Sequence, residues 1–106
     1  MTSERTAASK RAPPQRTSDY AKYFLKDWER LICSGRYDMN RLKEAMLLLI
    51  ANDALLGAEW LDHPFKDDWV DHRECHIGGD FMLIYQVEGN AINFVRAGTH
   101  AELFGE

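Results

Sequence analysis

The sequence contains few cysteines and no long apolar segment, and each shortage narrows the class of protein. Only Cys33 and Cys75 are present among 106 residues, too few for the disulfide framework of a small secreted protein. No apolar run approaches the roughly 20 residues that span a bilayer. The first residues also lack the apolar core of a secretory signal. These absences predict a cytoplasmic protein with reduced thiols and no membrane contact.

Positive charge is also scarce, and it is unevenly distributed. Lys and Arg number 13 against 17 Asp and Glu, which gives a net charge of −4. Residues 1–16 hold four basic residues and one acidic residue, a net of +3, so the other ninety residues carry −7. Proteins that grip nucleic acid through its phosphates usually show the opposite balance. The charge alone therefore argues against strong intrinsic affinity for nucleic acid.

The length and composition suit one domain with a modest core, since 45% of the residues are hydrophobic. Residues 1–13 show no apolar periodicity and are rich in Ser, Thr, Ala, Lys and Arg. This composition predicts a disordered N-terminal extension. The folded domain is expected to span residues 14–106.

Two amphipathic helices are predicted in the first half of the domain. The first is expected after Ser18, which suits an N-cap, and stops at Ser34-Gly35. The second spans about 38–53, and its leucines at 47 and 48 are expected to widen the buried face. Because few residues join the helices, an antiparallel pair is favoured.

The second half of the domain shows strand signals separated by turns. Strands are predicted at 73–77, 81–87 and 91–96, with a further short strand considered near 15–17. Residues 53–71 are expected to form a long loop. The sequence therefore predicts an α+β domain in which two antiparallel helices pack on a small antiparallel sheet.

All four histidines lie in the last 44 residues, at positions 63, 72, 76 and 100. Imidazole can both donate and accept protons near neutral pH, so the grouping suggests an acid/base site. Histidines scattered over a surface would give the same grouping by chance. Strand alternation places Glu74 and His76 on the face opposite Cys75 and Ile77, and it leaves both interpretations open.

A metal site is a weaker alternative. His72, Glu74 and His76 have the alternate-residue spacing with which a strand can present ligands to zinc. There is no paired-cysteine motif and no H-E-x-x-H motif, so we expect no metal and no cofactor. Cys75 is expected to point into the core, which disfavours a cysteine nucleophile.

Several short motifs follow one another in the second half of the chain: Asp62-His63-Pro64, Trp69, Arg73-Glu74-Cys75-His76, Asp80-Phe81, and Gly98-Thr99-His100-Ala101-Glu102-Leu103-Phe104-Gly105. Their order and spacing resemble those of the YafQ family of toxins, in the RelE-like superfamily. The similarity extends over about residues 15–105. The sequence departs from the family at Glu74, where Asp is frequent, and at Phe81, where Trp is frequent.

The resemblance implies a microbial RNase-type fold, metal-independent cleavage of messenger RNA on the ribosome, and assembly into an oligomer with a cognate antitoxin. The family's functional histidines, aspartate and C-terminal aromatic correspond to His63, His76, His100, Asp80 and Phe104 here. On this basis His100 is the expected general acid, and His76 or His63 is the expected base or phosphate contact. Asp80 would orient a histidine.

The remaining expected site residues would bind RNA or support their neighbours. Arg73 and Arg96 are candidates to stabilise the phosphate, although at most one is expected to reach it. Phe104 would stack on a base or simply cover the sheet. Glu74 would orient its neighbours. Trp60, Trp69 and Phe104 are considered as anchors for the antitoxin.

Two other functions stay open on the sequence alone. The acidic charge would suit a YafQ-like domain that has lost RNA cleavage and remains an antitoxin-binding or regulatory module. A metal-dependent hydrolase is the third and weakest alternative.

Overall fold

Residues 15–51, 56–64 and 71–105 are described in a computed structural model of the chain. The predicted extension at 1–13 lies outside these ranges. In chain order the elements are β1 (Thr17–Tyr20), α2 (Lys22–Ser34), α3 (Met39–Ala51), the 3₁₀ helix η1 (Ala58–Trp60), β2 (His63–Pro64), β3 (His72–Gly78), β4 (Phe81–Glu88), β5 (Ala91–Thr99) and α4 (His100–Phe104).

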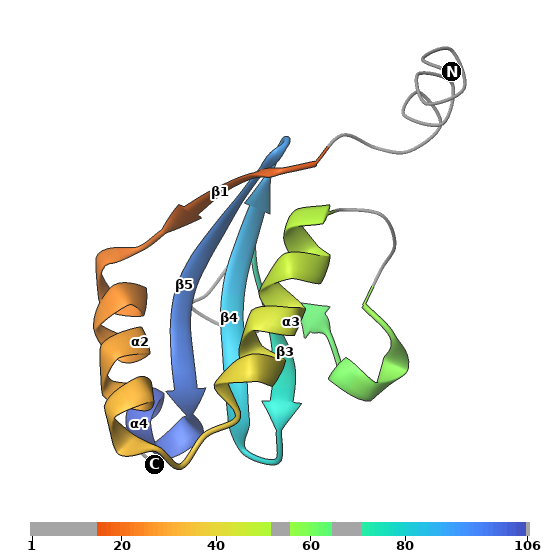
Figure 1. The fold of residues 1–106 in the computed structure, drawn as a ribbon. Helices are drawn as coiled ribbons and strands as arrows, with labels where there is room; N and C mark the ends of the chain where they lie inside the picture. The colour runs from red at the N-terminus through yellow and green to blue at the C-terminus, as the bar shows by residue number, and fades with distance from the viewer. Residues whose placement is uncertain (1–14, 52–55, 65–70, 106) are drawn as a thin grey trace, which may run out of the picture.

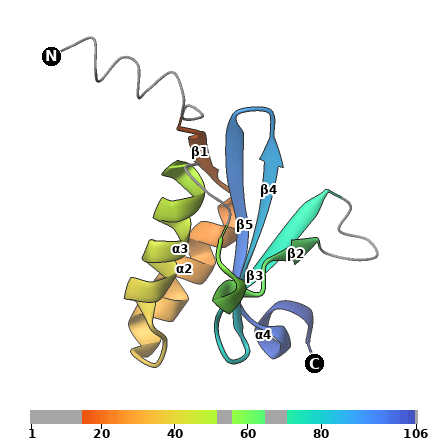
Figure 2. The same ribbon diagram turned by 90° about the vertical axis from the view of Figure 1, so that its right-hand side faces the viewer.

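The strands form one five-stranded sheet in the order β1-β5-β4-β3-β2. The pairs β2–β3, β3–β4 and β4–β5 are antiparallel, and β1 runs parallel to β5. Figures 1 and 2 show the antiparallel helices α2 and α3 on one side of this sheet and α4 on the other. The predicted α+β class and the helix-on-sheet arrangement are confirmed.

The start of the chain's first helix differs from the prediction. Ser18 is not an N-cap but a residue of β1, where it pairs with Ile92 of β5. Tyr20 also belongs to this strand, and its ring stacks on that of Phe94 at 5.6 Å between centroids. The helix begins only after Ala21, and it ends as predicted at Gly35, which has φ 67°. Parallel pairing with a distant strand therefore overrides the local capping signal.

The second helix begins at the predicted place, since the side chain of Asp38 accepts a hydrogen bond from the Arg41 N–H at 3.0 Å. Its buried residues are Leu42, Ala45, Met46 and Leu49. The predicted widening of this face is wrong: Leu47 is 66% exposed and Leu48 is 43% exposed. These two residues fall outside the i, i+3, i+4, i+7 set that faces the sheet.

The predicted loop at 53–71 contains two short elements that were not predicted. Helix η1 buries Trp60, which is 2% exposed. Strand β2 then adds to the edge of the sheet, with His63 opposite Glu74. Trp60 is therefore a core residue and not an anchor for a partner, while Trp69 lies outside the described residues.

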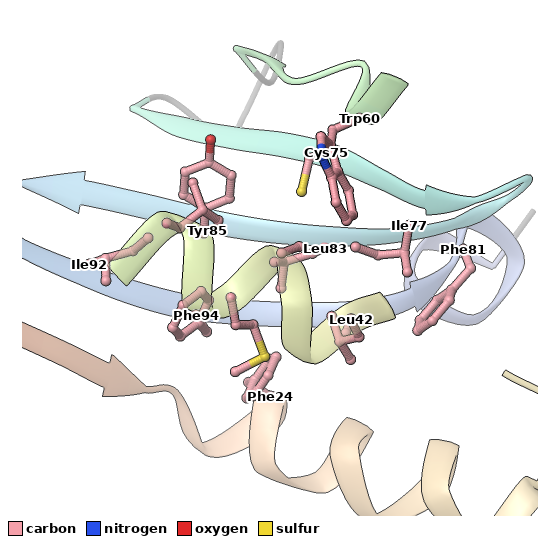
Figure 3. Close-up of a cluster of buried hydrophobic side chains, with 14 of the residues drawn as sticks. Phe24, Leu42, Trp60, Cys75, Ile77, Phe81, Leu83, Tyr85, Ile92 and Phe94 are labelled. Atoms are coloured by element: carbon pink, nitrogen blue, oxygen red, sulfur yellow. The ribbon is translucent and has the colours of Figure 1, made fainter. Parts of the chain in front are cut away.

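The core lies between the helices and the sheet. Figure 3 shows side chains from β3, β4 and β5 meeting those of α2 and α3, with Trp60 closing one side. Cys75 and Ile77 point into this core, as predicted, and Phe81 joins them at 5% exposure. Phe24, Leu31, Leu42, Leu83, Ile92 and Phe94 are almost completely buried. Glu74 and His76 of β3 consequently lie on the other face of the sheet.

Among the described residues, no helix is long and apolar enough to cross a membrane.

Candidate active site

Four of the expected site residues lie near the turn between β3 and β4. His63 lies on β2, His76 on β3, and His100 begins α4, which follows β5 directly. Asp80 occupies the turn itself. Figure 2 shows this turn and α4 at the same end of the sheet, with β2 beside β3.

His100 and Asp80 form the first pair. His100 Nδ1 lies 3.0 Å from Asp80 Oδ1, and both side chains are substantially exposed. A carboxylate only accepts hydrogen bonds, so Nδ1 carries the proton and Nε2 is the ring atom directed elsewhere. The ring of Phe104 lies one helical turn away, with its centroid 5.9 Å from that of His100. This geometry suits a histidine that exchanges protons through Nε2.

Local sequence explains why His100 occupies this place. Thr99 and Glu102 form a reciprocal capping box, with Glu102 N–H donating to the Thr99 hydroxyl and Thr99 N–H donating to the Glu102 carboxylate. The box starts α4 immediately after β5, so His100 is the first helical residue. Local sequence therefore specifies the start of this short helix.

His63, Glu74 and His76 form the second group. His63 Nε2 lies 3.2 Å from Glu74 Oε1, and the two histidine rings are 6.1 Å apart. His63 Nδ1 also lies 3.0 Å from the carbonyl oxygen of Pro64. Both neighbours of His63 are acceptors, so a doubly protonated ring satisfies both contacts. Such a ring would supply positive charge beside a buried carboxylate.

The two groups meet at the β3–β4 turn. His76 Nδ1 lies 3.5 Å from the carbonyl oxygen of Gly79, the residue that precedes Asp80. His76 pairs with Met82 across the strands, and Met82 pairs with Gly98, two residues before His100. The structure therefore brings His63, His76, Asp80 and His100 into one region, despite their separation in sequence.

Asp62, for which no role was predicted, fixes the chain beside His63. Its carboxylate accepts hydrogen bonds from Arg73 Nε at 2.8 Å and from the Tyr85 hydroxyl. Burial, helped by the hydrogen bond to Asp62, raises the pKa of Tyr85, so the phenol stays a donor at neutral pH. The contact joins the loop before β2 to β3 and β4. Arg73 is therefore engaged in positioning this loop.

The second predicted phosphate-binding arginine is also held by a carboxylate. Arg96 Nε and Nη2 donate to the two oxygens of Asp27 at 2.7 and 3.1 Å. Asp27 is only 4% exposed and also accepts from the Ala97 N–H. Sequence reasoning missed this aspartate, because it occupies the buried face of an amphipathic helix.

One group of the described residues has the donor atoms to hold a metal ion. Ligand atoms of His63, Glu74 and His76 lie within 4.8 Å of one another. Glu74 Oε2 is buried, and among the described side chains it has no hydrogen-bond partner in the structure. The group differs from the predicted alternative, since His63 of β2 takes the place assigned to His72. Two imidazoles and a carboxylate suit a borderline divalent ion such as zinc.

Comparison with known proteins decides the family. Residues 16–105 match the family described as bacterial toxins of type II toxin-antitoxin systems, YafQ. The chain belongs to the YafQ family. The match extends over all of the described residues except Gln15, so it includes every described residue of the candidate site.

Relatives of known structure agree with this assignment. The mRNA interferase toxin YafQ of Escherichia coli strain B / BL21-DE3 is 42% identical over 91 residues, which is 86% of this chain and 98% of that protein. The toxin in a crystal structure of the E. coli DinJ-YafQ complex superposes with a TM-score of 0.77 at 42% identity, covering 86% of this chain and all of that one. A metal-bound toxin from Helicobacter pylori superposes with a TM-score of 0.75 at 36% identity, over 84% of this chain and 99% of that one.

The departure at Phe81 has a structural explanation. This residue faces the helices, and its ring lies 4.9 Å from that of Tyr37. The aromatic side chain therefore packs in the core, where an indole N–H is not needed. The departure at Glu74 lies inside the site, and it sets how far the carboxylate reaches toward His63.

Proposed function

We propose that this YafQ-family protein is a metal-independent endoribonuclease that cleaves messenger RNA and is neutralised by a cognate antitoxin. The observation that carries the proposal is that three histidines and Asp80 lie near one turn. Each histidine ring contacts at least one hydrogen-bond acceptor. The E. coli relative, named an mRNA interferase toxin, and the DinJ-YafQ complex support the substrate class and the kind of partner. Because messenger RNA is translated in the cytoplasm, we expect the protein to act there.

The reaction uses the nucleophile that RNA itself carries. The 2'-hydroxyl oxygen attacks the adjacent phosphorus, and its proton passes to a base. The bond from phosphorus to the 5'-oxygen breaks, and that oxygen takes a proton from an acid. The products are a 2',3'-cyclic phosphate and a 5'-hydroxyl end, without any added oxidant or metal.

The hydrogen bonds favour particular roles for the histidines. His100 donates through Nδ1 to Asp80, so its Nε2 proton is available to the leaving 5'-oxygen, and Asp80 stabilises the charged ring. His76 donates through Nδ1 to the Gly79 carbonyl, which leaves the Nε2 lone pair to accept the 2'-hydroxyl proton. His63, oriented by Glu74, is the phosphate contact. Phe104 is placed to stack on a base beside His100.

Purified protein incubated with messenger RNA tests the proposal, with and without EDTA. We expect cleavage that EDTA does not change, and fragments that end in a cyclic phosphate and a 5'-hydroxyl. A 5'-phosphate product, or cleavage that depends on added zinc at the His63–Glu74–His76 group, would contradict the mechanism.

A second function is favoured by the charge of the chain. Residues 17–106 carry −7, which suits a protein that binds a basic antitoxin segment but no longer cleaves RNA. This alternative predicts antitoxin binding without cleavage, and without growth arrest when the protein is expressed from an inducible promoter. Growth arrest that disappears in a His100→Ala variant would exclude it.

A further inference from the structure

Glu102 makes contacts that a helix cap does not require. One carboxylate oxygen, Oε1, accepts from the Thr99 N–H at 2.9 Å and completes the capping box. The other oxygen, Oε2, lies 3.0 Å from Arg30 Nη1 and accepts from the Tyr37 hydroxyl at 3.1 Å. Arg30 belongs to α2, and Tyr37 follows α2 in the chain. The carboxylate thus joins the start of α4 to the helical layer.

Arg30 extends this connection into the interior. Its second amino group, Nη2, donates to Asp27 Oδ1 at 3.0 Å and to the Ala97 carbonyl at 3.3 Å. Asp27 is itself held by Arg96 and by the Ala97 N–H. One guanidinium therefore links a buried carboxylate of α2, the end of β5, and the first turn of α4.

The backbone between β5 and α4 leaves space for this pair. Gly98 has φ 155°, and a Cβ built on it would lie 2.8 Å from Glu102 Oε1 and 3.2 Å from Arg30 Nη2. Both distances are shorter than ordinary van der Waals contact, so a side chain here would push the Glu102 carboxylate or the guanidinium away. The close approach of the two charged groups depends on glycine at this position.

The helix that carries His100 needs such an anchor. Helix α4 has five residues, and none of them is buried. A helix of this length is unstable on its own, because nucleation is costly and few hydrogen bonds repay it. The contact of His100 with Asp80 lies at the surface, with both side chains more than 40% exposed, so packing does not fix it.

We propose that Arg30 and Glu102 are positioning residues for RNA cleavage: their ion pair holds the first turn of α4 where His100 faces Asp80 and the scissile phosphate. The inference rests on the proposed function. Neither side chain touches the reacting atoms, and both act through His100. Catalysis by a general acid depends on its placement, and a shift of about 1 Å can lower a rate about 100-fold.

Glu102→Gln separates anchoring from capping, because glutamine also completes a capping box but carries no charge for Arg30. We expect kcat for RNA cleavage to fall by about 10- to 100-fold, with KM and antitoxin binding unchanged. Glu29→Gln is the matched control, since it removes one carboxylate from the exposed face of α2, next to Arg30, and should leave kcat unchanged. Arg30→Lys retains the charge but cannot reach all three acceptors, so a smaller loss of kcat is expected.

A double-mutant cycle distinguishes positioning from general destabilisation. In a His100→Ala background, Glu102→Gln should cause no further loss of kcat, because the group that it positions is already absent. Equal losses in both backgrounds, or wild-type kcat in Glu102→Gln, would overturn the inference. If the Glu102→Gln variant is unfolded at the assay temperature, Arg30→Lys takes its place in the double-mutant cycle with His100→Ala, and the same outcomes decide.

A measurement without substrate keeps this inference distinct from the proposed function. The imidazole resonances of His100 in proton–carbon spectra should change in Glu102→Gln and stay unchanged in Glu29→Gln. If the wild-type protein cleaves no RNA, the proposed function fails, and these spectra still decide whether Arg30 and Glu102 position His100. Unchanged His100 resonances in Glu102→Gln would show that they do not.

Discussion

His100 is exposed, and its ring contacts the carboxylate of Asp80. His100→Ala should lower kcat for RNA cleavage by about 10²–10⁴-fold, the usual contribution of one acid/base group. Its exposed position predicts an unchanged urea midpoint. His72 is a histidine of the same sheet to which no role is assigned, so the His72→Ala variant should lose far less activity. Equal losses in the two variants would remove His100 from the mechanism.

The two thiols differ in burial, and their reactivity should differ accordingly. Burial raises the pKa of the Cys75 thiol to about 12, whereas Cys33 is exposed. The thiolate is the reactive form, so a thiol reagent at pH 8 should modify Cys33 in the folded protein and reach Cys75 only after denaturation. Cys33→Ser provides the control, because the folded variant should then show no fast-reacting thiol. Rapid modification of Cys75 in that variant would contradict its burial.

The same shift has a consequence for stability at high pH. Between the usual thiol pKa, about 8.5, and the raised value of about 12, the unfolded chain loses the Cys75 proton while the folded chain keeps it. The unfolded state then binds fewer protons, so the free energy of unfolding falls as pH rises through this range. The contribution of Cys75 is fully present below the lower value.

Single residues of the site could be predicted from sequence where their placement depends on local pattern. His100 follows Thr99 in a capping box, and the Thr-x-x-Glu pattern of that box can be recognised from the sequence alone. The role of Asp62 could not be predicted in the same way, because its partners Arg73 and Tyr85 meet it only through the pairing of β2, β3 and β4. Strand register is a tertiary property that a single strand's sequence does not state.

At the scale of elements, Asp27 connects α2 to the sheet. Its side chain is 5% exposed and is bound to Arg96, Arg30 and the Ala97 N–H. Asp27→Ala leaves the Arg96 guanidinium without its partner in a half-buried position, so a loss of about 3–5 kcal/mol in the free energy of unfolding is expected. Urea denaturation of this variant beside Glu29→Ala, an exposed carboxylate on the same helix, measures the effect. A loss below that of an ordinary surface substitution would show that the connection is unimportant.

The two main helices were predicted from their amphipathic period, and the central strand β4 from its continuous apolar run. The elements that were missed, η1 and β2, have only three and two residues. A first strand was considered near 15–17, but β1 lies at Thr17–Tyr20, where it pairs in parallel with β5 from the other end of the chain. Burial on α3 was predicted too broadly, because the sequence shows that Leu47 and Leu48 are apolar but not how wide the sheet beneath them is. Such facts belong to packing between elements, where sequence periodicity carries little information.

For the whole molecule, the distribution of charge limits how the protein can hold RNA. Residues 17–106 carry −7, and the two arginines expected to meet the phosphate, Arg73 and Arg96, are paired with Asp62 and Asp27. Each phosphate contact by a free basic residue would add about −0.9 to the slope of log affinity against log salt for a duplex, and about −0.7 for a single strand. With few such residues in the part of the site that the structure describes, intrinsic affinity for RNA should be weak and depend little on salt.

The ribosome can supply the positioning that the charge of the protein does not. We therefore expect messenger RNA on translating ribosomes to be cleaved much faster than the same RNA free in solution. A ribosome that binds both the toxin and the RNA would hold the scissile phosphate at the site, so the toxin would not need a basic surface of its own. Parallel time courses of the two substrates at equal RNA concentration measure the difference, with the His100→Ala variant as the background for contaminating nucleases. Cleavage of free RNA at the ribosomal rate, with the steep salt dependence of many phosphate contacts, would mean that residues outside those described here form an RNA-binding surface of their own.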